Sequence, residues 1–157
     1  MSLSYENALE YATKKHSGQK RLGGEPFITH PVEVSNIVRE WGYDMEYQIT
    51  ALFHDLLEDT DATEEEILAL SNENILEAVK VLTKVKPYNM DEYVANIKKN
   101  EIAFVVKGAD RLHNIRSAFC TSEKFRRKYI VETYDYYLDF TPEIRPALEK
   151  LVKTLED

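Results

Sequence analysis

Apolar residues recur along the chain at the three- and four-residue spacing of amphipathic helices, and no stretch alternates in the manner of a strand. The segment Leu3–His16 shows this spacing first, with Ala8, Leu9 and Ala12 separated by charged residues and Gly18 just beyond its end. The sequence contains only five Gly and five Pro, so interruptions are few. The pattern predicts an all-α fold.

The next two helices are predicted from the residues at their ends. A second helix should begin at His30-Pro31, because proline suits the first helical position, and should stop at Gly42. Asp44 is a favourable N-cap for a third helix, which we expect to continue to about Glu58. The segment 18–29 between the first two helices is rich in glycine and is predicted to be a loop.

The remaining helices complete a bundle of about eight to ten. Thr63 and Glu66 form a capping-box signature for a short fourth helix, and Asn72 or Asn74 begins a fifth. Further helices are predicted over Asp91–Asn100, Glu101–Phe119, Ser122–Phe140 and Pro142–Glu156.

The composition narrows the class of protein. The 157 residues, 43% of them hydrophobic, suffice for one core, so we expect a single domain over residues 1–157. A formal net charge of −8 repels polyanions, so we expect neither nucleic acid nor a membrane as a partner. The longest apolar run, Ile102–Val106, is too short to cross a bilayer, and the only cysteine, Cys120, excludes an intrachain disulfide. We therefore expect a cytoplasmic protein, whose oligomeric state the sequence leaves open.

The predicted third helix ends in the run HDLLEDT, residues 54–60, where several polar groups share one face. Residues three and four apart are neighbours on a helix, so Glu58 should lie beside His54 and Asp55, and Asp59 over Asp55. Clustered carboxylates repel one another unless a cation lies among them. The run therefore indicates either a metal site or a solvated helix face.

Two further positions carry polar groups in apolar surroundings. Asp110 and Asn114 lie four residues apart in the segment 102–119, so one face of a buried helix presents a carboxylate and an amide together. Buried polar groups need partners. His30 stands directly before Pro31, where its imidazole can point inward. Taken singly, neither position identifies a function.

Three segments together resemble a known family. The loop GQKRLGGEPFITHP at 18–31, the run HDLLEDT at 54–60 and the run VKGADRLHN at 106–114 look like the hydrolase domain of the RelA/SpoT alarmone enzymes. The resemblance extends from Tyr5 to about Tyr137 and is especially close to the small stand-alone alarmone hydrolases. It implies an HD-domain helical bundle with hydrolase activity and no synthetase domain.

The resemblance also implies roles for individual residues. One divalent metal, usually manganese in this family, would have as its ligands His30, His54, Asp55 and Asp110. The implied catalytic pair, which orients and deprotonates a water molecule, is Glu58 and Asp59. The implied substrate contacts are Lys20, Arg21 and Asn114.

The implied reaction is metal-dependent hydrolysis of guanosine tetra- or pentaphosphate, (p)ppGpp, to GDP or GTP and pyrophosphate. Two alternatives stay open: an HD phosphohydrolase acting on another phosphorylated nucleotide, such as NADPH or a nucleoside monophosphate, and a non-catalytic alarmone-binding module. Two residues depart from the family pattern. Gly108 replaces a bulky apolar residue, and Phe27 stands where tyrosine is common, which bears on the choice of substrate.

Overall fold

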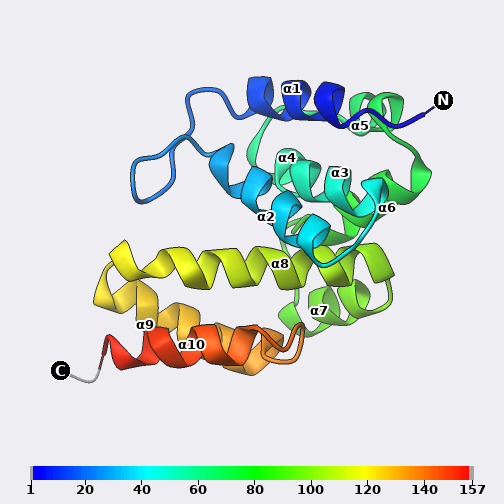
Figure 1. Ribbon diagram of the computed structural model, residues 1–157. Coiled ribbons are helices and arrows are strands. Elements are labelled where there is room, and N and C mark those ends of the chain that lie inside the picture. The colour runs from blue at the N-terminus through cyan, green and yellow to red at the C-terminus, as the bar shows by residue number, and fades with distance from the viewer. Residues whose placement is uncertain (1, 156–157) are drawn as a thin grey trace.

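The computed structural model describes residues 2–155, and within that range the fold is built from helices (Figure 1). An isolated antiparallel bridge between Lys20 and Pro26 is the only β pairing among the described residues. The all-α prediction is therefore confirmed, and no helix in residues 2–155 has the length and apolar character needed to cross a membrane.

The helices and their bounds are α1 (Tyr5–Lys15), α2 (Thr29–Glu40), α3 (Met45–Phe53), α4 (Leu56–Asp59), α5 (Glu64–Leu70), α6 (Glu73–Leu82), α7 (Met90–Lys98), α8 (Glu101–Ser117), α9 (Glu123–Glu132) and α10 (Ile144–Lys153). A 3₁₀ turn, η1 (Ala118–Cys120), follows α8, and a π-helical turn, η2 (Thr133–Tyr137), follows α9. Short polar side chains accept backbone N–H groups at most helix starts, namely at Ser4, Asp44, Thr63, Asn72, Asn89, Asn100 and Ser122. The capping box predicted from Thr63 and Glu66 is confirmed.

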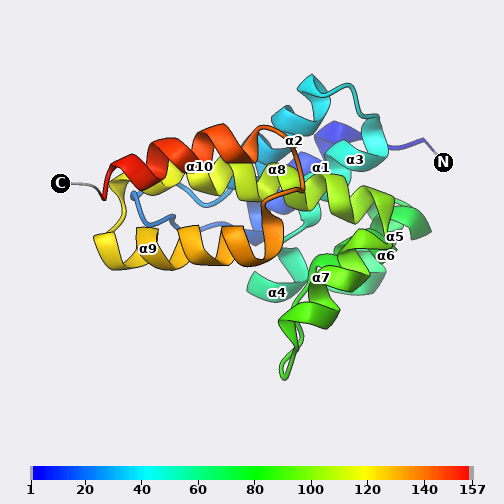
Figure 2. The same ribbon diagram turned by 90° about the horizontal axis from the view of Figure 1, so that it is seen from below.

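Helix α8 is the central element of the fold. It contacts α2, α3, α6, α7 and α10. Figure 1 shows α1, α2 and α3 on one side of α8 and α9 and α10 on the other, and Figure 2 shows the same elements from below. One buried apolar cluster surrounds α8, and a second joins α1, α3, α5 and α6. Asp110 and Arg111 are buried within α8 as well, so this helix brings charge into the interior.

The third helix is shorter than predicted. It ends at Phe53, and the one-turn helix α4 begins only at Leu56, whereas we expected a continuous helix to about Glu58. The break occurs because the His54 imidazole bonds through Nδ1 to the carbonyl oxygen of Ala51, 2.6 Å away, and so competes with the helical ladder. The HDLLEDT run is therefore divided between two elements.

Other boundaries also differ from the predictions. Helix α2 begins at Thr29, which places Pro31 third in the helix instead of first. The helix expected over Ser122–Phe140 widens into the π turn η2 after Glu132, where the Thr133 hydroxyl donates to the carbonyl of Tyr129. The last helix covers residues 144–153, and the predicted end at Glu156 lies outside the described residues.

Candidate metal centre and substrate cavity

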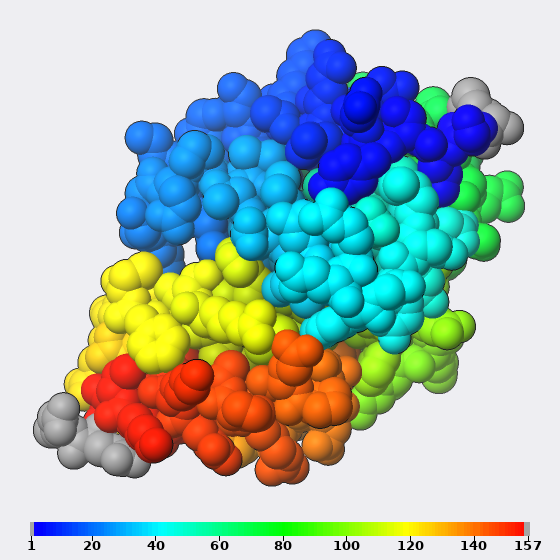
Figure 3. Space-filling view, in the orientation of Figure 1, coloured from blue at the N-terminus to red at the C-terminus, as the bar shows by residue number. Residues whose placement is uncertain are grey.

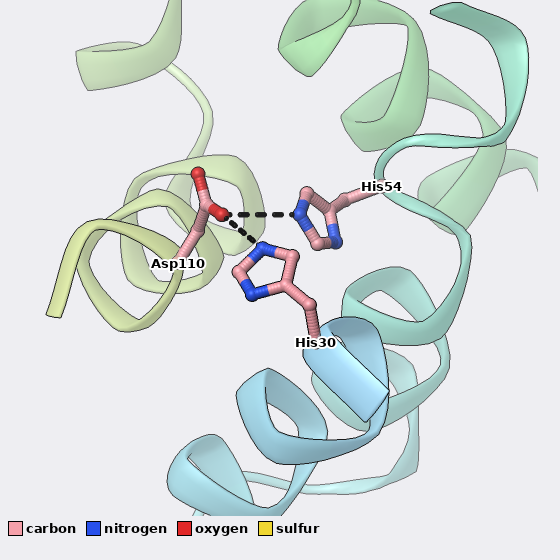
Figure 4. Close-up of side chains that lie close together, drawn as sticks. All are labelled: His30, His54 and Asp110. Carbon is pink, nitrogen blue, oxygen red and sulfur yellow. Dashed lines mark hydrogen bonds and ion pairs between the residues drawn. The ribbon is translucent and has the colours of Figure 1, made fainter. Parts of the chain in front are cut away.

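Three polar side chains from three different segments of the chain meet at α8 (Figure 4). His30 comes from the first turn of α2, His54 directly follows α3, and Asp110 lies in the middle of α8. The Nε2 atoms of His30 and His54 lie 2.7 and 3.3 Å from Oδ1 of Asp110. All three residues are buried, and each offers a ligand atom within 4.8 Å of the other two. The fold thus assembles residues that are 24 to 80 positions apart in the sequence into one candidate metal centre.

Asp55 lies at the edge of this centre. Its Oδ2 atom is 3.1 Å from Nε2 of His54 and 4.0 Å from Nε2 of His30. Its side chain is 22% exposed, against 8% for Asp110. The four residues named from the sequence as metal ligands are therefore neighbours, with Asp55 on the side that faces solvent.

Hydrogen bonds orient both imidazoles. Nδ1 of His54 donates to the Ala51 carbonyl, which leaves Nε2 directed at the carboxylates. Nδ1 of His30 lies 2.8 Å from Nδ1 of His113, so one of these two atoms must donate and the other accept. Burial, followed by the influence of His30 and Arg21, lowers the pKa of His113 to about 4. His113 is thus neutral at physiological pH, and its Nδ1 can accept a hydrogen from His30.

The charges of the centre stabilise one another. Burial alone would lower the pKa of His54, but the adjacent carboxylates of Asp55 and Asp110 raise it well above its usual value. Burial would raise the pKa of Asp110, but the Lys107 ammonium and His54 hold it well below its usual value. The Nζ atom of Lys107 is 3.1 Å from Oδ2 of Asp110. In the absence of a metal, protons and Lys107 therefore compensate the carboxylates.

The two residues expected to form the catalytic pair lie on α4, and both are exposed. One carboxylate oxygen of Glu58 accepts a hydrogen bond of 2.8 Å from the backbone N–H of Lys84, in the loop after α6. Partial desolvation and the carboxylates of Asp55 and Glu58 raise the pKa of Asp59 to about 6. Asp59 is thus close to the ionisation range of a general base that works near neutral pH.

A cavity of about 270 Å³ lies beside the centre, between the 18–29 loop and the C-terminal half of α8. Figure 3 shows an opening where the blue loop approaches the yellow end of α8. Arg21 crosses this interface and donates to Oδ1 of Asn114 at 2.9 Å and to the hydroxyl of Ser117 at 3.3 Å. Asn114 in turn donates to Oδ1 of Asp110 at 3.2 Å. The three predicted substrate contacts, Lys20, Arg21 and Asn114, all line the cavity, and Lys20 is exposed.

Comparison with known proteins identifies the family. The HD domain family matches residues 8–141. This chain belongs to the HD-domain family.

Relatives of this HD-domain chain support the resemblance noted in its motifs. A protein named guanosine-3′,5′-bis(diphosphate) 3′-pyrophosphohydrolase from Aquifex aeolicus (strain VF5) is 38% identical over 140 residues, covering 84% of this chain and 20% of the relative. A protein named GTP pyrophosphokinase from Myxococcus xanthus is 35% identical over 146 residues, covering 84% of this chain and 19% of the relative. The chain thus spans about a fifth of the length of these curated relatives. That residues 1–157 form a single domain stays a prediction.

A solved structure shows the same fold. It is described as a metazoan orthologue of SpoT that hydrolyses ppGpp and plays a role in starvation responses. The likeness has a TM-score of 0.80 at 24% sequence identity and covers 99% of this chain and 98% of that chain. The predicted similarity to RelA/SpoT-type HD domains is confirmed.

The sequence analysis missed two side chains of the HD-domain centre, His113 and Lys107. Both were inside the run VKGADRLHN but received no role. They lie three residues after and three residues before Asp110, which on a helix makes them its neighbours. The same spacing that paired Asp110 with Asn114 would have found them.

Proposed function

We propose that this HD-domain protein removes the 3′-pyrophosphate from guanosine tetra- or pentaphosphate, giving GDP or GTP and pyrophosphate. The observation that carries the proposal is the unbroken hydrogen-bonded connection from the metal centre into the cavity. Asp110 contacts both histidines, Asn114 contacts Asp110, and Arg21 contacts Asn114. A nucleotide in the cavity would therefore meet the Arg21 guanidinium and the Asn114 amide, which contacts Asp110 of the metal centre. The names of the relatives point to the same substrate.

The donor atoms of the centre suit a divalent cation. The hydrogen bond to Ala51 leaves Nε2 of His54 available as a ligand, and the contact with His113 does the same for Nε2 of His30. Two imidazoles with the carboxylates of Asp55 and Asp110 favour manganese or ferrous iron over magnesium, and we propose manganese. A cation held there would polarise a phosphate oxygen and acidify a water molecule.

The side chains around the centre would supply the remaining catalytic and binding roles. The attacking water forms a bond to the phosphorus next to the ribose 3′ oxygen while the bond from that phosphorus to the 3′ oxygen breaks. Pyrophosphate keeps the water oxygen, and the ribose 3′ oxygen leaves and takes up a proton from solvent. Asp59 accepts a proton from the water, which its pKa near 6 permits, and Glu58 orients the water. Arg21 balances charge on the pyrophosphate group under attack, and Asn114 and Lys20 hold the nucleotide.

The test uses purified protein that has been stripped of metal and reloaded with manganese, zinc or magnesium. Guanosine tetraphosphate, NADPH and a nucleoside monophosphate are offered separately, and products are resolved by anion-exchange chromatography. We expect GDP and pyrophosphate with manganese, and loss of turnover in Asp59→Asn. Asp61→Asn is the matched control, because Asp61 is a nearby exposed acid paired with Lys15 and should retain full activity.

Other outcomes separate the alternatives. Turnover of NADPH or the monophosphate alone would retain the centre and reject the alarmone as substrate. Saturable binding of guanosine tetraphosphate without turnover under any metal would reject the hydrolase and favour a binding module.

A further inference from the structure

A buried histidine and a glutamine connect the end of α1 to the last residue of α4. His16, the C-cap of α1, is 2% exposed, and its Nδ1 atom lies 2.9 Å from Oε1 of Gln19. The Nε2 amide of Gln19 donates to the backbone carbonyl of Asp59 at 2.9 Å. None of the roles assigned above uses either residue.

The chemistry of the partners fixes the direction of these bonds. A backbone carbonyl can only accept, so the NH₂ group of Gln19 must face Asp59 and its oxygen must face His16. Nδ1 of His16 therefore carries the hydrogen and donates it to Gln19. The other ring nitrogen, Nε2, is buried and makes no hydrogen bond to any residue in the range 2–155. The bond to Gln19 is thus the one hydrogen bond that the imidazole makes within the described residues, and the ring also packs against Phe27, with ring centroids 4.7 Å apart.

Helix α4 needs an external support. It has only four residues, and a single helical turn is too short to be stable by itself. Its last carbonyls have no partner within the helix, and the side chain of Gln19 supplies one to Asp59. The position of the Asp59 carboxylate relative to the metal centre therefore depends on a contact from the loop after α1.

We propose that His16 and Gln19 are a positioning pair for Asp59: His16 fixes the amide of Gln19, and Gln19 fixes the backbone of the catalytic carboxylate. The proposal rests on the role of Asp59 in the proposed function. The pair acts through Asp59, and neither residue makes a hydrogen bond to any of the proposed metal ligands.

Four variants test the pair. His16→Leu removes the donor to Gln19, and Gln19→Leu removes the support of Asp59. His16→Asn places an amide N–H close to the position of Nδ1 and serves as the conservative rescue. Lys15→Met is the matched control, because Lys15 also joins α1 to the segment after α4, through its 2.9 Å contact with Asp61, without touching Asp59.

Kinetics gives the first readout. We expect both leucine variants to lower kcat by about 10-fold to 100-fold, which is the cost of a displacement of roughly 1 Å in a catalytic group. KM and the manganese dissociation constant, measured by calorimetry, should stay within about 3-fold, and His16→Asn should recover most of kcat. Because the pair acts through Asp59, His16→Leu should cause no further loss in an Asp59→Asn background. Losses that add in this background would overturn the proposal.

Hydrogen exchange gives a second readout that needs no substrate. The amides of Asp59 and Thr60 bond to the carbonyls of Asp55 and Leu56, at 3.0 Å each. Both amides should exchange at least about 10-fold faster in His16→Leu and Gln19→Leu than in the wild type or Lys15→Met. Unchanged exchange would reject the positioning pair even if the wild type hydrolyses the alarmone. Faster exchange in a protein that hydrolyses no alarmone would instead reject the proposed function and retain the structural contact. If His16→Leu does not fold, Gln19→Leu decides alone, since Gln19 is only half buried.

Discussion

Replacing Asp110 by asparagine tests how the metal-free centre is held together. Asparagine keeps the shape of the side chain and removes its charge. Asp110 receives four contacts, from His30 Nε2 at 2.7 Å, Lys107 Nζ at 3.1 Å, Asn114 Nδ2 at 3.2 Å and His54 Nε2 at 3.3 Å. Only the contact with Lys107 involves a permanent, deeply placed ammonium, whose side chain is 12% exposed. Lys107 is therefore the group that Asp110→Asn leaves uncompensated.

The expected cost follows from that buried charge. Removing one partner of a buried ion pair costs about 3 kcal/mol or somewhat more. For a domain of this size, each kcal/mol lowers the melting temperature by about 2–4 °C, so Asp110→Asn should melt about 6–12 °C below the wild type without metal. Lys107→Met should also be destabilised, because it leaves Asp110 without its ammonium. The double variant Asp110→Asn/Lys107→Met should recover much of the loss, because no buried charge is left unpaired.

The stability of the metal-free protein should fall at both low and high pH. The lowered pKa of Asp110 gives stability that is present above its unfolded value of 3.8 and lost as the pH falls through the folded pKa. The raised pKa of His54 gives stability that is present below its unfolded value of 6.5 and lost as the pH rises through the folded pKa. The metal-free wild type should therefore be most stable between these limits, and Asp110→Asn should flatten both sides.

Circular-dichroism melts in excess chelator, repeated across this pH range, measure the stability, and calorimetric titration with manganese measures metal binding. The double variant should regain stability and still fail to bind manganese. Two results would refute the reasoning: a melting temperature for Asp110→Asn within about 2 °C of the wild type, or no recovery in the double variant.

Three further predictions concern catalysis and packing. The wild-type kcat/KM should fall about tenfold per pH unit on the acid side of an inflection, which should lie at or below the Asp59 pKa of about 6 because a bound cation can only lower that pKa. Asp59→Asn should remove the inflection and lower kcat by about 100-fold or more. A pH profile unchanged in Asp59→Asn would contradict the assignment of Asp59 as the base. Arg21→Met should lower kcat/KM for the alarmone by about 10-fold to 100-fold, which corresponds to the loss of a hydrogen bond to a charged group. Arg145→Met is the control: it removes only an exposed ion pair with Asp139 and should leave kcat/KM unchanged. Gly108→Ala should raise the melting temperature by about 2–4 °C, because alanine favours the helix by about 1 kcal/mol relative to glycine. The added Cβ would meet only ordinary contacts with Phe140, the nearest at 3.4 Å. A lower melting temperature would show that there is no room for the added Cβ.

The sequence predicted local structure better than it predicted where helices are interrupted. Helix starts followed from cap residues such as Asp44 and Thr63, because capping is decided within four residues of the chain. The break at His54 depends on a side chain that bonds its own helix, and the apolar periodicity of the segment does not reveal such a bond. The π turn at Thr133–Tyr137 was missed for the same reason, since its apolar positions still fit helical spacing.

In the candidate site, too, local features could be predicted from the sequence, whereas contacts between distant segments could not. The residues that the resemblance implied as metal ligands are neighbours in the fold, although their role as ligands stays a prediction, and His113 was within reach of helical spacing from Asp110. Other contacts depend on how distant segments fold together. Glu58 was expected beside His54 and Asp55, but its carboxylate also accepts the N–H of Lys84, 26 residues later. Gly108 was a departure from the family pattern without a known consequence, and it faces Phe140. Phe27, the other departure, packs at a tilt against His16 and approaches His30 edge-on.

The interruption between α3 and α4 also has an evolutionary consequence. Three of the residues that would bind a cation, His30, His54 and Asp110, lie in or directly after helices of nine residues or more, whereas the carboxylates of the proposed catalytic pair occupy a single turn supported from outside. Under the proposed function, changes confined to that turn would abolish turnover and leave recognition intact. A scaffold of this kind needs few mutations to pass from hydrolase to receptor. The same separation gives the experimenter a direct way to trap an intact nucleotide in the cavity.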